Sequence, residues 1–228
     1  MKTEELIARL RTDVAKGAGA AELTPVIDAL ADALEAQRAL EQRVRRNHDA
    51  IMRLARSPSV GEGRLEESLH EITECASQVL GVERSSVWTY DADHTAILCL
   101  ELHVRATGTH ESGVVLPASS YPAYFRALRE ERTIAAHDAH TDPHTSEFSE
   151  GYLRPLGIGA MLDAPIRVGG RMIGVLCNEH VGPARTWTAD EEQFAGSIAD
   201  FVALAMESQK RRESEEQLRA MVAAFEER

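Results

Sequence analysis

The stretch GVLCNEHVGPARTWTADEEQFA, residues 174–195, concentrates side chains that can do chemistry. It carries a thiol, a carboxylate and an imidazole at Cys177, Glu179 and His180. Enzymes use these residue types as nucleophile–base pairs and metal ligands. Strand alternation, however, places Cys177 and Glu179 on one face and Asn178 on the other. We therefore predict a strand, a turn and a helix start here, and the role of Glu179 stays open.

The stretch HDAHTDPH, residues 137–144, holds the densest set of metal-binding residue types. Its possible ligands to zinc or another divalent ion are His137, Asp138, His140, Asp142 and His144. The spacing crosses a proline and differs from the two-ligand helical spacing of known zinc motifs. We predict a solvated loop in which both aspartates accept turn hydrogen bonds, and thus no metal site. A metal site at His137, His140 and His144, or contacts with an organic ligand, are the alternatives.

The three cysteines, Cys75, Cys99 and Cys177, stand far apart in the sequence. An odd, scattered set gives no disulfide framework, and without a secretory signal it indicates a reducing, cytoplasmic location. We expect all three to be small buried hydrophobic residues. Thiol chemistry needs a thiolate with a resolving thiol close by, and only a tertiary structure tells whether Cys99 and Cys177 are neighbours.

The composition is that of a globular protein with a strongly acidic surface. The chain has 228 residues, of which 43% are hydrophobic and 27% charged, and its formal net charge is −12. A core of this size folds without metal or disulfide support. The negative field repels phosphate backbones and anionic lipid, so we expect no nucleic-acid partner and no membrane-surface binding. No apolar run approaches the about 20 residues of a membrane span.

Residues 1–57 are predicted to form an N-terminal helical dimerisation segment. A short helix at about 3–16 precedes a long one that starts near Pro25, with Thr24 as its cap. A heptad pattern along the long helix predicts a parallel dimer, and a single amphipathic helix packed on its own domain is the alternative. One seam position holds Leu23, Leu30, Gln37, Val44 and Ile51, and the other holds Val26, Ala33, Leu40, Asn47 and Leu54.

Residues 58–205 alternate between helical and strand patterns. SPSVGEG, at 57–63, is predicted to be a linker or tight loop. Helices are predicted at 64–81, 120–132 and 151–157, and strands at 82–91, 95–104, 133–139, 159–168 and 171–181. The first two strands and the last two read as antiparallel hairpins, the second of which turns on Gly169-Gly170.

A last helix is predicted to begin after Thr188 and to run on through a polar tail. Thr188 and Glu191 form a capping box, and an acidic first turn complements the helix dipole. Beyond residue 205 the pattern stays helical, and Leu218, Val222 and Phe225 restore an apolar stripe near the end. We expect residues 206–228 to be a C-terminal signalling helix that connects to an output domain.

On the motifs GVERSSVWTYD, YLRPLGIGAMLDAPIRVGGRMIGVLCNEHVG and RTWTADEEQFAGSIADFVALAMES, the sequence resembles a GAF domain of bacterial signalling proteins. The resemblance covers about residues 64–208, and the tail resembles linkers to PAS, histidine kinase or diguanylate cyclase modules. It implies an α+β fold with a GAF-like antiparallel β-sheet flanked by helices, with long N- and C-terminal coiled-coil-type helices. It further implies a ligand pocket on one sheet face and dimerisation through the flanking helices.

The resemblance leaves the ligand and any cofactor unknown. Family members bind cyclic nucleotides, bilins, haem or small organic molecules. No cysteine here is followed by histidine, as bilin attachment commonly requires. The family's nucleotide motif, Asn-Lys, Phe and Asp-Glu, appears as Asn178-Glu179, Trp187 and Asp190-Glu191, so its Lys–Asp ion pair cannot form. A related GAF-type enzyme reduces methionine sulfoxide with clustered pocket cysteines, which this sequence does not show.

Aromatic and polar residues of the strands and middle loops are the candidates to line a pocket. The candidate ligand-binding residues are Trp88, Tyr90, Tyr124, Asp138, Asp142, His144, Phe148, Tyr152, Met161 and Asp163. Alternation places Trp88 with Tyr90, and Met161 with Asp163, on shared strand faces. An inward Asp163 needs a partner, for which we expect Arg154, Arg126 or a cationic ligand.

These features together predict a cytoplasmic, homodimeric, non-catalytic sensory domain for signal transduction. It binds a small molecule, or relays a dimer rearrangement, through its flanking helices to an output domain outside this chain. A thiol- or metal-dependent enzyme on the same fold, and a ligand-free dimerisation module whose own side chains fill the pocket, are the alternatives.

Overall fold

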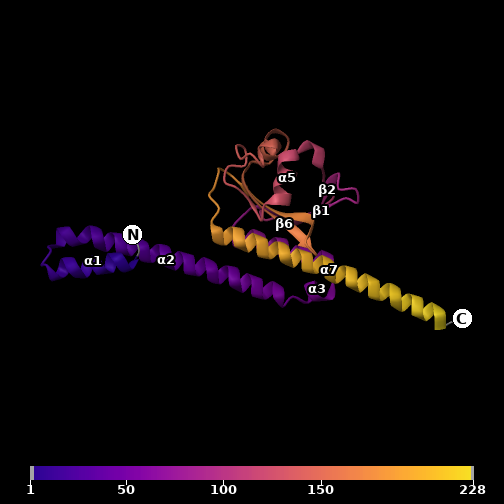
Figure 1. The fold of residues 1–228 in the computed structure, drawn as a ribbon, viewed down its shortest axis with the longest axis horizontal. Coiled ribbons are helices and arrows are strands. Elements are labelled where there is room, and N and C mark those ends of the chain that lie inside the picture. The colour runs from indigo at the N-terminus through magenta and orange to yellow at the C-terminus, as the bar shows by residue number, and fades with distance from the viewer. Residues whose placement is uncertain (1–2, 227–228) are drawn as a thin grey trace. The chain divides into compact units, whose positions relative to one another are not determined.

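The computed structural model describes residues 3–226, and the chain divides between Asp49 and Ala50 into two compact units. The described part of the first unit consists of α1 (Thr3–Ala15) and most of α2 (Ala20–Ala55), joined by a short turn (Figure 1). The two helices lie antiparallel, and Leu6 and Val26 are buried in this unit. The predicted pair of a short and a long helix is therefore present.

The start of α2 differs from the prediction. The helix begins at Ala20, and Pro25 lies inside it rather than at its first position. The Thr24 hydroxyl donates a hydrogen bond to the Ala20 carbonyl oxygen at 2.8 Å, which is a bond made within a helix and not by a cap. Glu22 instead accepts a bond from the Gly19 backbone nitrogen at 3.2 Å. Local capping by Glu22 allows the helix to start one turn earlier.

The predicted dimer seam on α2 is partly covered within the first unit. Val26 is 3% exposed, and Leu23 and Leu30 are half-buried. Further along, Leu40 and Val44 are 44% and 51% exposed. The parallel dimer stays a prediction, and its apolar contacts on α2 would concentrate around these two residues.

Helices of the second unit pack on one face of a β-sheet. They are α4 (Leu65–Leu80) and the first half of α7 (Ala189–Glu226), and α3 (Pro58–Glu62) packs against these two helices. Most of the stretch predicted to be a linker at 57–63 is thus helix α3. Gly63 ends α3 with φ of 68°, and a Cβ there would lie 2.6 Å from the Ser208 carbonyl oxygen. Glycine at this position permits the close contact between the end of α3 and α7.

The sheet is antiparallel throughout, which confirms the predicted α+β fold. In the described residues its order is β3-β2-β1-β7-β6-β5, and β4 pairs with β2. The strands are β1 (Arg84–Tyr90), β2 (Ala96–Val104), β3 (Thr109–Glu111), β4 (Val115–Pro117), β5 (Ile134–Ala136), β6 (Ile158–Val168) and β7 (Arg171–Val181). The sequence did not predict β3 and β4, because each has only three residues and their stability comes from pairing with β2.

Both predicted hairpins are present. β1 pairs with β2, and β6 pairs with β7 across Gly169-Gly170, whose φ angles of 56° and 79° suit a tight two-residue turn. The β1–β2 ladder contains a β-bulge, since Val87 lies opposite Glu101 while the next residue, Trp88, lies opposite Cys99. The long central pairing of β1 with β7 joins the two hairpins into one sheet.

The sheet separates two hydrophobic clusters. One lies under α4 and α7 and includes Ile72, Leu176 and Ile198. The other lies under α5 (Pro122–Glu130) and the middle loops and includes Trp88, Tyr124 and other candidate residues. Figure 1 shows α7 along one side of the sheet and α5 on the opposite side. The middle loops contain short helical turns at Ser146–Phe148, Ser149–Leu153 and α6 (Arg154–Leu156), which Gly157 ends as predicted.

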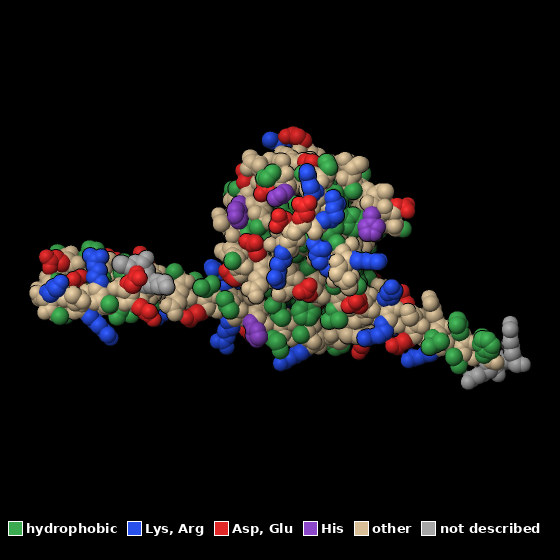
Figure 2. Space-filling view, in the orientation of Figure 1, with side chains coloured by type: hydrophobic (Ala, Val, Ile, Leu, Met, Phe, Trp, Pro, Cys, Tyr) green, Lys and Arg blue, Asp and Glu red, His purple; other side chains and the backbone are tan. Residues whose placement is uncertain are grey.

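α7 is one continuous helix with two different environments. The Glu191 half of its predicted capping box is present, because the Glu191 carboxylate accepts bonds from the Thr188 nitrogen and hydroxyl at 2.9 and 3.0 Å. The first half packs on the sheet, whereas the side chains from residue 210 to residue 225 are exposed. Figure 2 shows hydrophobic side chains near its far end, and the large exposed ones are Leu218, Met221, Val222 and Phe225.

Candidate functional site

Seven of the ten predicted pocket residues lie together on the sheet face beneath α5. This group, which we call the α5-side cluster, consists of Trp88, Tyr90, Tyr124, Phe148, Tyr152, Met161 and Asp163. Alternation along β1 and β6 places Trp88, Tyr90, Met161 and Asp163 on this face. α5 and the middle loops close it from above and contribute Tyr124, Phe148 and Tyr152. The other three, Asp138, Asp142 and His144, lie on the loop of residues 137–144, which we call the middle loop.

Aromatic rings of the α5-side cluster contact one another. Phe148 stacks on Tyr121 at 3.9 Å between ring centroids and meets Tyr124 edge-on at 4.9 Å. Tyr152 approaches Phe148 at 6.2 Å. Such pairs stabilise a packed arrangement beyond their area burial alone. The rings thus pack against one another above the sheet.

Asp163 is the central polar group of the cluster. It is fully buried, and its Oδ2 accepts a hydrogen bond from the Tyr124 hydroxyl at 2.6 Å. Its Oδ1 has no hydrogen-bond partner among the described residues. Burial raises the pKa of Asp163 to about 7. The partner we expected, Arg154 or Arg126, is thus replaced by a phenol, because Arg126 is exposed and Arg154 pairs with Glu150.

A buried ion pair lies beside Asp163 and gives Glu179 a partner. Glu179 is 2% exposed and accepts a hydrogen bond from Arg84 Nε at 2.8 Å. The two residues are directly opposite in the β1–β7 ladder. The pKa of Arg84 is raised, since the attraction of Glu179 and the contact with Tyr152 outweigh burial. The sequence could not reveal this pair, because residues almost 100 positions apart become neighbours only through the β1–β7 pairing.

The cysteines are free and buried, as predicted. Cys177 contacts the Tyr124 hydroxyl at 3.5 Å, and Cys99 contacts the Glu101 carbonyl oxygen at 3.5 Å. Burial raises the pKa of all three thiols, that of Cys99 to about 12 and that of Cys177 well above its ordinary value. Protonated thiols are poor nucleophiles and poor metal ligands.

Asn178 serves the architecture of the sheet. It accepts a hydrogen bond from the Ser85 hydroxyl at 3.0 Å and donates one to the Leu162 carbonyl oxygen at 3.0 Å. Trp187 donates from its indole to the Ala136 carbonyl oxygen, and the Arg185 guanidinium lies 4.1 Å from its ring centroid. The residues that stand at the family's nucleotide motif therefore hold strands and loops together.

The middle loop uses its aspartates as predicted. Asp138 accepts a hydrogen bond from the His140 nitrogen at 3.0 Å, and Asp142 accepts one from the His144 nitrogen at 2.8 Å. Hydrogen bonds from Thr141 and His140 lower the pKa of Asp138. His137 accepts a bond from the Trp187 nitrogen. Asp138 and Asp142 are thus engaged in local turns, and His137 makes a contact between loops.

Two hollows lie on the surface of the second unit. One, of about 560 Å³, lies beside the middle loop. It is lined by Asp138, His140, Arg154, Gly157, Ile158, Gly159, Gly182, Pro183 and Ala184. The other, of about 590 Å³, lies between the end of α5 and the start of α7 and is lined by Glu131, Arg132, Thr133, Ala189, Glu192 and Gln193. Asp138 and His140 are the predicted site residues among these linings.

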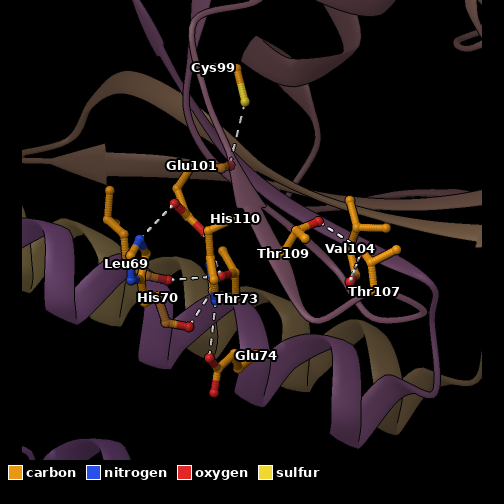
Figure 3. Close-up of polar contacts among 10 residues, drawn as sticks. All are labelled: Leu69, His70, Thr73, Glu74, Cys99, Glu101, Val104, Thr107, Thr109 and His110. Carbon is orange, nitrogen blue, oxygen red and sulfur yellow. Dashed lines mark hydrogen bonds and ion pairs between the residues drawn. The ribbon is translucent and has the colours of Figure 1, made fainter.

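A second cluster of ionisable residues lies on the helix side of the sheet (Figure 3). His70 and Glu74 come from α4, Glu101 from β2 and His110 from β3. Glu101 is 4% exposed, and its carboxylate meets His110 Nδ1 at 2.5 Å and His70 Nε2 at 3.3 Å. Although burial opposes protonation, hydrogen bonds to Glu101 and Glu74 raise the pKa of His110. No local sequence pattern indicates this cluster, because its members are spread over three elements.

These features define an α+β domain built on an antiparallel sheet. Helices cover one face of the sheet, and the Asp163 carboxyl is enclosed on the other. Residues 64–206 match the GAF domain family. The match covers more than half of the chain, which therefore belongs to the GAF domain family.

Solved structures agree with this fold. The GAF domain of a phosphoenolpyruvate-protein phosphotransferase from Acinetobacter has a TM-score of 0.55 at 13% identity, over 76% of this chain and 98% of that one. The cyanobacteriochrome receptor PixJ has a TM-score of 0.52 at 19% identity, over 61% and 92%. A bacteriophytochrome from R. palustris has a TM-score of 0.60 at 18% identity, over 78% and 40%. At these identities the likeness shows the fold alone.

No curated protein matches this chain. Among the described residues, no helix is long and apolar enough to cross a membrane.

Proposed function

We propose that this chain is a non-catalytic sensory or regulatory GAF domain of a cytoplasmic bacterial signalling protein. In this proposal, a small molecule at the α5-side cluster, or a rearrangement between two copies, changes the flanking helices. α7 then transmits the change to an output domain of the histidine kinase, PAS or diguanylate cyclase type.

The observation that carries the proposal is the division of α7 into a packed and an exposed half. Phe194, Ile198 and Val202 of the first half are buried against the sheet. Leu218 and Val222 of the second half are 60% and 49% exposed, and residues four apart lie on one helix face. A rigid helix that is anchored in the domain and apolar beyond it is suited to pair with a second copy and to carry movement outward.

The polar chemistry of the α5-side cluster supports binding rather than catalysis. A small ligand in this space would meet the unpaired Oδ1 of Asp163 and the aromatic faces of Phe148 and Tyr152. The buried thiols have raised pKa values, which argues against the thiol-dependent alternative. The ring-to-ring packing favours the other alternative, a dimerisation module whose own side chains occupy the pocket.

Mass spectrometry of the purified chain under non-denaturing conditions distinguishes a ligand-binding domain from a ligand-free dimerisation module. A co-purified small molecule that is lost in a Phe148→Ala variant supports a ligand at the α5-side cluster. A chain that carries no added mass and that binds nothing from a cytoplasmic extract supports the ligand-free module.

The dimer is tested by a substitution in the exposed half of α7. The double variant Leu218→Glu/Val222→Glu places two charges in the apolar stripe, so we expect it to shift the mass in sedimentation equilibrium from dimer to monomer. The matched control is Arg212→Glu/Glu216→Arg, which exchanges the two members of an exposed ion pair on the other face of the same helix and is expected to leave the dimer intact. A wild-type chain that sediments as a monomer at micromolar concentration contradicts the proposal.

A further inference from the structure

The cluster of His70, Glu101 and His110 has the donor atoms of a metal site. Its ligand atoms all lie within 4.8 Å of one another, and it is the one such group of three in the described residues. Two imidazoles and a carboxylate form a donor set that suits zinc and similar divalent ions. Figure 3 shows the three side chains pointing toward one another from α4, β2 and β3. The topology thus assembles ligands from three separate elements.

A distortion of the sheet directs Glu101 into this cluster. Val87 lies opposite Glu101 and Trp88 lies opposite Cys99, so Leu100 is the extra residue of a β-bulge. Cys99 faces the α5-side cluster, and regular alternation would direct Glu101 to that face as well. Because of the bulge, Glu101 points instead toward α4. Bulges commonly re-aim a functional side chain in this manner.

The charges of the cluster call for a cation at its centre. Glu101 is nearly buried, and each of its oxygens faces an imidazole nitrogen, that of His70 at 3.3 Å and that of His110 at 2.5 Å. The other ring nitrogen of His110 meets the Glu74 carboxylate at 3.1 Å. Because a carboxylate removed from water is stabilised by positive charge beside it, a metal ion held by these three groups would stabilise the buried Glu101.

We propose that His70, Glu101 and His110 bind one divalent transition-metal ion of the zinc class. Nε2 of His70, Nδ1 of His110 and a carboxylate oxygen of Glu101 are the ligands. Two atoms at about 2.0–2.2 Å from a tetrahedral ion lie roughly 3.3–3.6 Å apart. The His70–Glu101 separation of 3.3 Å fits this geometry, whereas the His110–Glu101 contact of 2.5 Å must widen to admit the ion. The His70 side chain is 36% exposed and has room to turn toward the ion. Solvent on that side supplies the fourth ligand.

Glu74 is an outer partner of this site. It accepts from Nε2 of His110, which leaves Nδ1 for the metal, and it lies one helical turn from His70 on α4. A carboxylate behind a metal-binding histidine fixes the ring and makes it a better ligand. The Glu74 side chain is 57% exposed, so its replacement leaves the core unchanged. The site lies on the opposite sheet face from the α5-side cluster, and the inference does not rest on the proposed sensory function.

Isothermal titration with zinc chloride tests the site on the full, tag-free chain after chelator treatment. We expect one zinc ion per wild-type chain. His110→Asn removes a ligand and is expected to abolish the stoichiometric binding. Glu74→Gln keeps all three ligands and is expected to weaken binding by about 10- to 100-fold. The same samples are heated, since a ligand that binds the folded state raises the Tm of wild type but not of His110→Asn.

The matched control is His140→Asn/His144→Asn, which removes two histidines of the middle loop. It is expected to bind zinc as the wild type does. Circular dichroism confirms that every variant is folded before titration. The inference is overturned if wild type binds no zinc, if His110→Asn keeps the stoichiometric binding, or if the loop control loses it. Tetrahedral absorption bands of bound Co²⁺ in wild type, absent in His110→Asn, give an independent readout.

Discussion

At the scale of single residues, the buried polar groups govern the properties of the α5-side cluster. Asp163, Tyr124, Glu179 and Arg84 all lie on one sheet face, and three of them are almost fully enclosed. The Arg84–Glu179 pair is satisfied, whereas one oxygen of Asp163 is not. An unpaired buried oxygen lowers the stability of the fold. Such a group is retained most readily where a ligand or a proton supplies the missing bond.

The raised pKa of Asp163 makes stability depend on pH. Its carboxyl ionises at about 7 in the folded chain against 3.8 ordinarily, so between these values the folded state holds the extra proton. The free energy of unfolding should therefore fall as pH rises from about 4 to about 7, by an amount of the order of a few kcal/mol, and level off above. Asp163→Asn, which cannot ionise, flattens this part of the profile.

Urea unfolding of wild type and Asp163→Asn from about pH 5 to about pH 8 measures the effect. Asp93→Asn, in the exposed β1–β2 turn, is the control and keeps the wild-type slope. Parallel profiles for wild type and Asp163→Asn would show that the carboxyl ionises normally in the folded chain.

At the scale of elements, close contact between strands fixes the path of the sheet. Gly174 of β7 faces β1, and a Cβ on it would lie 2.0 Å from the Trp88 carbonyl oxygen. The α5-side cluster depends on this contact, because Trp88 of β1 belongs to the cluster and Cys177 of β7 packs beside it. The strand pairing and the cluster are thus built from the same residues.

Gly174→Ala is expected to destabilise the second unit by about 1–3 kcal/mol, since the backbone of β1 must move to admit the methyl group. Gly196→Ala is the matched control. Gly196 lies in α7, and a Cβ on it would come no closer than 3.7 Å to the Arg132 side chain. Because alanine is favoured over glycine within a helix, this variant should be more stable by about 0.5–1 kcal/mol. Chemical unfolding measures the change in the free energy of unfolding for both variants. Equal changes of the same sign would contradict the assigned contacts.

At the scale of the whole molecule, the chain combines parts of unequal internal packing. The sheet and its two hydrophobic clusters lie in the second unit. In the described part of the first unit, Leu6 and Val26 are the buried hydrophobic residues, and the outer half of α7 has exposed side chains. Helices with little tertiary packing are marginal in water.

Hydrogen exchange followed by mass spectrometry tests this difference. In dilute solution we expect fast exchange in residues 3–45 and 210–225 and slow exchange in β1, β6 and β7. Pairing of two copies through the exposed stripes would slow exchange in the helices as the protein concentration rises, without changing the strands. Helices that exchange as slowly as the strands at every concentration would contradict the expectation.

The sequence by itself determined the elements whose signals are local. The glycine pair at 169–170, the Thr188–Glu191 box and the apolar stripe of α7 each act within a few residues, so the hairpin and the last helix were predictable. The family motifs likewise identified the GAF domain, and alternation placed Trp88 and Asp163 on the enclosed face.

Only the tertiary structure decided which polar groups meet. Tyr124 as the partner of Asp163, and Arg84 as that of Glu179, follow from the packing of α5 and from the β1–β7 ladder. The cluster around Glu101 depends on a bulge and on a three-residue strand, neither of which has a local sequence signal. Pairings between residues distant in sequence are set by the sum of many weak contacts across the fold, which periodicity along the chain does not encode.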